Sequence, residues 1–130
     1  MGDFQELKQI DGLSISAVSA DLYGDGRDDV SLFYFNNGAK YASVFTKSKI
    51  VSESIEWNLK NKNKFIRALL VNTKNANTFN GKQGFYALKE LSKSLSKQLT
   101  LRLSQEPGGA KDSVDPDEII FASTGVIGEP

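Results

Sequence analysis

The sequence predicts a mixed α/β domain in which helices pack on a sheet. Alternating apolar residues and turn-rich stretches in the first third of the chain are typical of antiparallel strands. Residues 66–71 are apolar except for Arg67, residues 82–99 are amphipathic, and residues 118–122 are apolar after Glu118, which together indicate a strand, a helix and a strand in packed layers. The chain has 130 residues, 39% of them hydrophobic, which suits one domain.

The first predicted strands lie between residues 13 and 46. Apolar residues alternate with polar ones over residues 13–17, and residues 30–35 are rich in β-branched and aromatic side chains. Asn-Asn-Gly at 36–38 accepts positive φ angles, so this tripeptide predicts a tight hairpin turn. Residues 41–46 are then the returning antiparallel strand.

Two helices are predicted. Ser52 or Ser54 is a suitable N-cap for a short helix that carries Trp57 and ends at the Asn-Lys-Asn-Lys stretch 61–64. Residues 82–99 form a longer amphipathic helix, because apolar side chains recur there every three or four positions. These positions are Phe85, Leu88, Leu91 or Ser92, Leu95 and Leu99.

Buried strands are predicted on either side of the long helix. Residues 66–71 are compact and apolar after Arg67 and suit a strand buried on both faces. Residues 104–118 combine Pro, Gly and acidic residues without an apolar period, which is typical of an exposed loop. Residues 118–122 form the last strand, which leads directly into Ser-Thr-Gly at 123–125.

Lysines mark one side of the long helix. Lys89, Lys93 and Lys97 are four residues apart and share a face, which suits an anionic ligand or nucleic acid, although a solvated helix surface is the simpler interpretation. The 16 basic and 16 acidic residues balance to zero net charge, and nucleic acid is not expected as a partner. No apolar run approaches the roughly 20 residues of a membrane span. A secretory signal is not recognisable, so we expect a cytoplasmic protein.

Composition restricts the chemistry. The chain has no Cys and no His, which excludes thiol nucleophiles, Cys-type metal sites and a Ser-His-Asp triad. Chemistry therefore relies on hydroxyls, carboxylates, lysines and backbone groups. A Thr nucleophile activated by an α-amino group stays compatible with the composition, because it needs neither missing residue.

The stretch from Asp21 to Asp29 alternates carboxylates with glycines, as calcium loops do. An EF-hand loop that starts at Asp21 needs Asp or Asn where Tyr23 stands and Glu where Leu32 stands. A shorter propeller-type loop would use Asp21, Asp25 and Asp29, but such loops come in arrays and this chain has one copy. We therefore prefer a solvated acidic hairpin turn and expect no metal.

Two further segments present hydrogen-bond donors. Residues 72–84 form an Asn- and Gly-rich loop between a strand and a helix start, a common place for ligand contacts. Residues 123–128 form a turn in which a hydroxyl beside an exposed N–H is a suitable donor pair for an oxyanion. Taken singly, an ordinary loop and a strand-terminating turn explain each segment.

The two segments also occur as long motifs, VNTKNANTFNGKQG at 71–84 and STGVIGEP at 123–130. Together they resemble signature segments of the ornithine acetyltransferase family, also called bifunctional glutamate N-acetyltransferase. The first is similar to the family's Val-Asn-Thr-Gly-Asn-Ala-Asn-Ala followed by Gly-x-x-Gly. Arg-Asp-Asp-Val at 27–30 and Ala-Ser-Val-Phe-Thr at 42–46 are weaker matches.

The resemblance implies an αββα layered sandwich, of which residues 1–130 form the N-terminal, alpha-chain part. It implies an enzyme of arginine biosynthesis that moves an acetyl group from N-acetylornithine to glutamate. Family members are longer precursors that cut themselves at an Ala-Thr bond, and the freed Thr is the nucleophile. The family's oxyanion hole maps onto the Thr124 hydroxyl and the Gly125 N–H.

The sequence departs from the family pattern at three places. Lys74 stands where the family usually has Gly, Ser-Glu-Ser at 52–54 replaces Ala-Ala-Pro, and the acidic loop 104–118 is longer than is common. These changes are compatible with a divergent paralogue that uses another acyl acceptor.

The family segment that holds the cleavage point and the nucleophile is not among the 130 residues. Thr124 is not that nucleophile, because Ser123 precedes it where the cleavage site has Ala. We expect the isolated chain to be inactive.

Expected partners are the remainder of the precursor, N-acetylornithine and glutamate, and further processed chains in a homo-oligomer. No cofactor is expected, with acetyl-CoA an optional acetyl donor. The alternative is a non-catalytic stand-alone binding or structural domain of the same fold.

Overall fold

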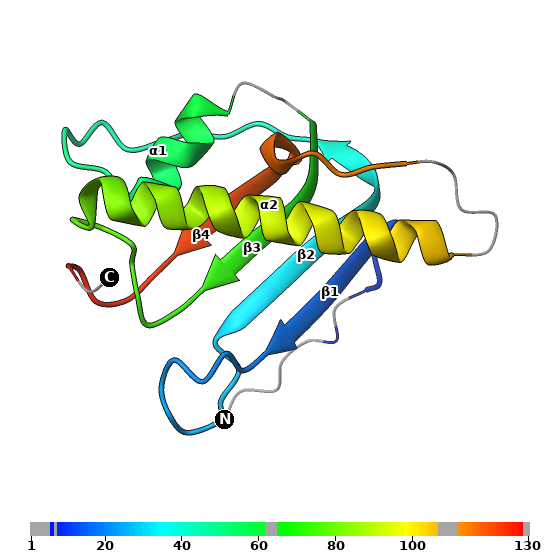
Figure 1. The fold of residues 1–130 in the computed structure, drawn as a ribbon, viewed down its shortest axis with the longest axis horizontal. Coiled ribbons are helices and arrows are strands. Elements are labelled where there is room, and N and C mark those ends of the chain that lie inside the picture. The colour runs from blue at the N-terminus through cyan, green and yellow to red at the C-terminus, as the bar shows by residue number, and fades with distance from the viewer. Residues whose placement is uncertain (1–5, 7, 62–64, 107–111, 129–130) are drawn as a thin grey trace.

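A computed structural model describes residues 6, 8–61, 65–106 and 112–128. In this part of the chain, a four-stranded sheet carries two helices on one face (Figure 1). None of the described helices is long and apolar enough to cross a membrane. The elements are β1 (Leu13–Val18), β2 (Val30–Lys40), α1 (Glu53–Lys60), β3 (Phe65–Asn72), α2 (Gly81–Gln105), the one-turn 3₁₀ helix η1 (Pro116–Glu118) and β4 (Ile119–Ser123). The predicted mixed α/β class is confirmed.

The strands lie in sequence order, β1-β2-β3-β4. β1 and β2 are antiparallel, as are β2 and β3, whereas β3 and β4 are parallel. A parallel pair needs a crossover connection, and α2 supplies it by lying across the sheet (Figure 1). The carboxyl ends of β3 and β4 therefore lie at the same edge of the sheet.

The pairing register assigns one apolar face of the sheet to the helices. Ala68 of β3 lies opposite Tyr34 of β2 and Ile119 of β4, and residues that lie opposite each other share a face. All three are buried and belong to one hydrophobic core. The core is completed by Leu88, Leu99, Val114 and Phe121, with Leu32, Trp57, Leu70, Leu95 and Leu103 packed against it.

α2 presents small residues to this core. Ser92 is fully buried and Ser96 is nearly so, and their hydroxyls donate to the carbonyls of Lys89 and Lys93 at 2.8 and 2.9 Å. The hydroxyls are thus satisfied inside the helix, and their small size lets α2 approach the sheet. The sequence left Leu91 and Ser92 as alternatives, and the structure buries Ser92.

The outer edge of β4 is closed by side chains of α1. The Asn58 amide donates to the Phe121 carbonyl at 2.8 Å, and its oxygen accepts the Phe121 N–H at 3.1 Å. Trp57 donates its indole N–H to the Ile119 carbonyl at 2.9 Å, and its ring meets Phe121 edge-on at 5.7 Å. Asn58 and Trp57 therefore replace a neighbouring strand and leave these edge groups paired.

Arg67 is the buried cation of β3, with 4% of its surface exposed. Its guanidinium donates to Asp112 at 2.8 Å, to the Tyr34 hydroxyl at 3.0 Å and to the Asn36 carbonyl at 2.9 Å. These bonds compensate for its burial and tie the segment before η1 to the sheet.

The opposite face of the sheet, which we call the open face, has no helix over it in the described residues. The prediction that residues 66–71 are buried on both faces is wrong for residues 69–71, which are only partly buried. The side chains of the open face are mostly apolar, and Ile15 on this face is 61% exposed. By register, the apolar members of the open face are Leu13, Ile15, Ala17, Phe33, Phe35, Leu69, Val71, Ile120 and Ala122.

The hairpin predicted at 36–38 and the strand predicted at 41–46 are wrong. β2 continues through the tripeptide to Lys40, which lies opposite Phe65. Gly38 has a φ of 72°, and a Cβ on it would lie 1.9 Å from the Phe65 ring. The tripeptide therefore forms a bulge within one strand, where glycine is also favoured, and the segment after Lys40 is irregular.

The predicted helices are found with corrected ends. The Ser52 hydroxyl accepts the Ile55 N–H at 3.3 Å, so Ser52 rather than Ser54 is the N-cap of α1. α2 extends past the predicted 82–99 to Gln105, because the apolar spacing continues at Leu103.

The loop predicted at 104–118 is only partly correct. Val114 is buried, with 4% of its surface exposed, and its N–H donates to the Thr100 hydroxyl of α2 at 3.0 Å. Pro116–Glu118 forms η1, and residues 107–111 lie outside the described part of the chain. The last strand, predicted at 118–122, is found one residue later.

Replacing Asn58 by Ala tests the closure of the β4 edge. The variant removes both hydrogen bonds to Phe121, so we expect the free energy of unfolding to fall by about 2 kcal/mol. Equilibrium urea unfolding measures the loss. Glu56→Ala on the same helix is the control, because it breaks only an exposed ion pair and should cost less than about 1 kcal/mol. Equal losses in the two variants would contradict the role of Asn58.

Candidate functional site

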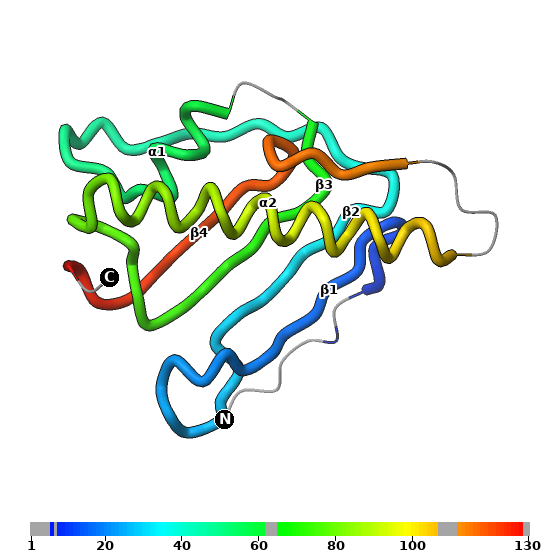
Figure 2. The backbone as a smooth tube through the Cα atoms, viewed as in Figure 1, coloured from blue at the N-terminus to red at the C-terminus, as the bar shows by residue number. Residues whose placement is uncertain are grey.

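The two motif segments meet at the carboxyl ends of β3 and β4. Asn72, the last residue of β3, lies opposite Ser123, the last residue of β4. Beyond these residues the two chain segments continue side by side (Figure 2), and Asn75 and Val126 form a parallel bridge. The structure therefore brings together the two candidate segments that the sequence singled out separately.

Backbone hydrogen bonds hold the two segments in register beyond the sheet. They run in both directions between the segments, so each segment supplies donors and acceptors. The four bonds are Thr124 N–H to Asn72 O (3.0 Å), Val126 N–H to Lys74 O (2.6 Å), Ala76 N–H to Val126 O (3.0 Å) and Gly128 N–H to Thr78 O (2.8 Å).

A series of side-chain hydrogen bonds stabilises the place where β3 and β4 end. Ser123 Oγ donates to Asn72 Oδ1 at 2.7 Å, and Ser54 Oγ lies 2.9 Å from Ser123 Oγ. Since the Ser123 hydroxyl has one proton and gives it to Asn72, Ser54 is the donor to Ser123. The Asn72 amide nitrogen in turn donates to the Asn75 carbonyl at 2.9 Å. Helix α1, β4 and the Asn-rich loop are thereby connected.

Thr124 and Gly125 carry two donors that have no acceptor among the described residues. The N–H groups of Thr124 and Val126 on either side are bonded, whereas the Gly125 N–H and the Thr124 hydroxyl have no hydrogen-bond partner in the structure as described. Both residues are exposed. The backbone that carries these two adjacent donors is thus held by its bonded neighbours, and the donors remain available to an external acceptor, as an oxyanion site requires.

The position of Gly125 demands glycine. Its φ is 128°, which L side chains rarely adopt, and a Cβ there would lie 2.0 Å from the Lys74 carbonyl oxygen. The close approach of the two backbones at this point brings the Lys74 carbonyl to the Val126 N–H.

Lys74, which departs from the family's usual Gly, has a φ of 71°. A left-handed conformation costs a non-glycine residue about 1 kcal/mol, which explains why glycine suits this position. The Lys74 ammonium group donates to the Leu22 carbonyl, so the side chain ties the Asn-rich loop to the connection between β1 and β2.

Glu53 is a buried carboxylate that holds the start of α2. One carboxylate oxygen accepts the N–H groups of Asn80 and Gly81 at 3.1 and 2.8 Å, while the Asn80 side chain makes no cap bond. The Glu53 N–H donates to the Asn77 carbonyl at 2.9 Å. A negative charge at a helix N-terminus is favourable, so Glu53 both caps α2 and fixes the loop before it.

Glu53 and Ser54 support the site, although neither was predicted to do so from the sequence. One feature of the sequence could have indicated their role, namely that Ser-Glu-Ser stands at 52–54 where the family pattern has Ala-Ala-Pro. In the structure Ser52 caps α1, Glu53 caps α2 and Ser54 bonds to Ser123. The first turn of α1 therefore contacts both motif segments.

A hollow of about 420 Å³ lies between the first turns of α2 and the sheet. Asn72 and Ser123 contribute to its wall, but Thr124 and Gly125 do not. Its remaining lining combines apolar side chains with neutral amides. The hollow and the unused donors are therefore neighbouring but separate features.

The acidic stretch from Asp21 to Asp29 is the connection between β1 and β2, which confirms the hairpin interpretation. The buried Asp29 carboxylate accepts the N–H groups of Ala20 and Leu22 at 2.6 and 2.7 Å. Hydrogen bonds from Arg27 lower the pKa of the Asp25 carboxyl below its ordinary value. The carboxylates thus stabilise the loop itself, and no described group of three or more Asp, Glu, His or Cys side chains is placed to hold a metal.

This fold is that of the ornithine acetyltransferases. The structure matches the crystal structure of ornithine acetyltransferase complexed with ornithine from Mycobacterium tuberculosis with a TM-score of 0.78, at 21% identity, over 92% of this chain and 58% of that one. The arginine biosynthesis bifunctional protein ArgJ from Bacillus halodurans matches with a TM-score of 0.71, also at 21% identity, over 92% and 56%. One helix layer and one sheet of the expected sandwich are seen here.

The chain belongs to the ArgJ family, whose model matches residues 14–130. It is 38% identical to the arginine biosynthesis bifunctional protein ArgJ of Bradyrhizobium diazoefficiens over 96% of this chain and 27% of that protein. It is also 38% identical to the protein of the same description from Nitrobacter winogradskyi, over 98% and 29%. The chain therefore spans less than a third of the length of these relatives.

Replacing Gly125 by Ala tests the close approach of the two segments. The added methyl group meets the Lys74 carbonyl, so we expect a loss of about 2 to 3 kcal/mol in the free energy of unfolding and faster exchange of the Val126 N–H. Gly128→Ala is the matched control, because Gly128 also has positive φ, 81°, but open space around it. A loss no larger than that of the control would contradict the proposed contact.

Replacing Glu53 by Ala tests the cap on α2. Loss of the carboxylate should cost about 1 to 2 kcal/mol and accelerate hydrogen exchange at Asn80 and Gly81. Glu53→Gln keeps an acceptor oxygen and should retain more of the protection. Unchanged exchange at both amides in Glu53→Ala would show that Glu53 does not hold the helix start.

Proposed function

We propose that this chain supplies the oxyanion-stabilising part of an acetyltransferase of arginine biosynthesis, which moves an acetyl group from N-acetylornithine to glutamate. The unused donor pair of Thr124 and Gly125 carries this proposal. The family membership supports it, because the relatives are described as bifunctional proteins of arginine biosynthesis. The ornithine complex of the M. tuberculosis enzyme is consistent with an ornithine-type substrate.

In the proposed reaction, a nucleophilic hydroxyl attacks the acetyl carbonyl carbon and the carbonyl oxygen becomes an oxyanion. The Thr124 hydroxyl and the Gly125 N–H donate hydrogen bonds to that oxygen. The C–N bond of the donor then breaks, the amine leaves with a proton, and the acetyl group stays on the nucleophile until glutamate accepts it. Donors that are already fixed stabilise the charge without reorganising during the step.

The rigidity of the turn supports this role. The Asn72 carbonyl fixes the Thr124 N–H, the Lys74 carbonyl fixes the Val126 N–H, and Asn72 Oδ1 fixes the Ser123 hydroxyl. The two proposed donors lie between these bonds. In the proposed mechanism Asn72 and Ser123 therefore position the donors and do not contact the reacting atoms.

We propose that the nucleophile comes from the remainder of the same precursor and that this remainder covers the open face. Four strands contribute apolar side chains to that face, and Ile15 and Ala17 are exposed on it. Burial of such side chains against a second sheet would stabilise an assembled protein by about 25 cal/mol for each Å² removed from water. By itself, the chain is expected to transfer no acetyl group.

Thr124→Ala in the full-length protein tests the assigned role. We expect kcat to fall about 10²- to 10³-fold, because one oxyanion donor is lost. The melting temperature should stay nearly constant, since Thr124 is exposed and its hydroxyl makes no hydrogen bond to any residue that the structure describes. Thr124→Ser retains the hydroxyl and is the control that should keep most of the rate.

An unchanged kcat in Thr124→Ala would rule out the oxyanion role. Turnover of N-acetylornithine by the isolated chain would show that its nucleophile lies within these 130 residues. A full-length protein that binds glutamate or N-acetylornithine but transfers no acetyl group would favour a non-catalytic domain of the same fold.

A further inference from the structure

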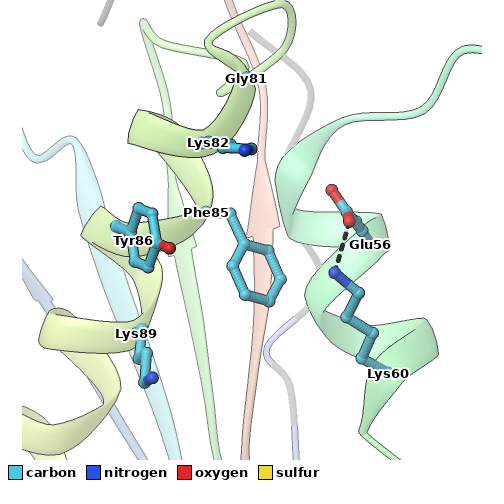
Figure 3. Close-up of a pocket in the computed structure, with 7 residues that line it drawn as sticks. All are labelled: Glu56, Lys60, Gly81, Lys82, Phe85, Tyr86 and Lys89. Atoms are coloured by element: carbon cyan, nitrogen blue, oxygen red, sulfur yellow. Dashed lines mark hydrogen bonds and ion pairs between the residues drawn. The ribbon is translucent and has the colours of Figure 1, made fainter.

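A groove of about 540 Å³ runs along the outside of the helix layer, between α1 and the first turns of α2. Its volume lies in the range of roughly 300 to 1,000 Å³ that is usual for small-molecule sites. Figure 3 shows Phe85 between the two helices and Lys82 extending from α2 toward α1. The groove is formed by Glu56, Lys60, Gly81, Lys82, Phe85, Tyr86 and Lys89.

The charge of the groove is positive. Lys60 is neutralised by Glu56 at 2.6 Å, whereas Lys82 and Lys89 form no ion pair in the part of the chain that the structure describes. The first turn of α2 contains no acidic residue, and Glu90, the nearest acid along the helix, pairs with Lys93 at 2.8 Å. Two unpaired ammonium groups therefore remain for an anionic ligand.

An exposed aromatic ring lies between these two lysines. Lys82, Tyr86 and Lys89 follow the spacing i, i+4, i+7, so the three side chains form one stripe along α2. Tyr86 is 60% exposed, which leaves its ring accessible for stacking. Phe85, in contrast, is engaged by Lys60, whose ammonium group lies 4.1 Å from the ring centre, and by the Trp57 ring at 5.8 Å.

We propose that this groove binds a nucleoside diphosphate, with the base stacked on Tyr86 and the phosphates held by the lysines. Lysine binds phosphate as a compact charge, and stacking of a base on an aromatic side chain is sequence-tolerant and favourable. Lys82 and Lys89 are about 10 Å apart along the helix axis, so a ligand that joins a planar ring to two phosphates reaches both a lysine and the ring. The proposal does not depend on the acetyl-transfer function.

Titration of the chain with ADP at low ionic strength tests this proposal, with pyrophosphate and adenosine as probes of the two halves. Backbone amide shifts in an NMR titration locate the site and give the affinity. We expect ADP to shift the amides of residues 81–89 and to bind more tightly than either half. High salt should weaken binding, because surface charges are screened.

Three variants distinguish the groove from a general effect of charge. The double variant Lys82→Gln/Lys89→Gln should bind ADP about tenfold more weakly, since it removes two charge-assisted contacts. Tyr86→Ala should weaken the binding of ADP but leave the binding of pyrophosphate nearly unchanged. Lys97→Gln/Arg102→Gln removes the same charge from the same exposed helix outside the groove and leaves the Glu90–Lys93 ion pair intact, so it is the matched control.

Three results would overturn the proposal. One is the absence of saturable amide shifts with ADP. Another is equal weakening by the control double variant, which would indicate attraction to the whole helix. The third is binding of a short poly-glutamate peptide at residues 81–89 as tightly as ADP, which would assign the groove to acidic segments. All substituted side chains are exposed, so the variants are expected to fold.

Discussion

The parallel pairing of β3 and β4 is the constraint on which the site depends. Because the strands are parallel, both end at one edge of the sheet, and the pairing of Asn72 with Ser123 sets the register of everything beyond. The Asn-rich loop and the Ser-Thr-Gly turn continue this register through backbone bonds. A shift by one residue would place Thr124 or Val126 where Gly125 now lies, with a side chain against the Lys74 carbonyl.

Helix α1 stabilises the paired ends of β3 and β4 through three sets of contacts. Its side chains close the outer edge of β4, and its first turn caps α2 through Glu53 and reaches Ser123 through Ser54. The eight-residue helix thus contacts both β4 and the start of α2. The two faces of the sheet therefore differ. One is covered by helices, and the open face is mostly apolar and has no helix over it in the described residues.

Sequence reasoning predicted the elements with strong periodicity, namely β3, α2 and β4, and it singled out the two segments that meet at the site. It failed at residues 36–38, because Asn-Asn-Gly favours positive φ in a hairpin turn and in a bulge alike, and only pairing with β3 decides between them. The roles of Glu53 and Ser54 were not predictable either, since their partners are distant in the sequence. Burial of Arg67 similarly depends on Tyr34 and Asp112.

The proposed site requires that the Gly125 N–H, which has no acceptor among the described residues, lies between two bonded neighbours. Residue-resolved hydrogen exchange of the chain measures this directly, because exchange requires that an amide be free of its acceptor. We expect strong protection at Thr124 and Val126 and none at Gly125. Protection of Gly125 comparable to that of its neighbours, or the absence of protection at all three amides, would contradict it.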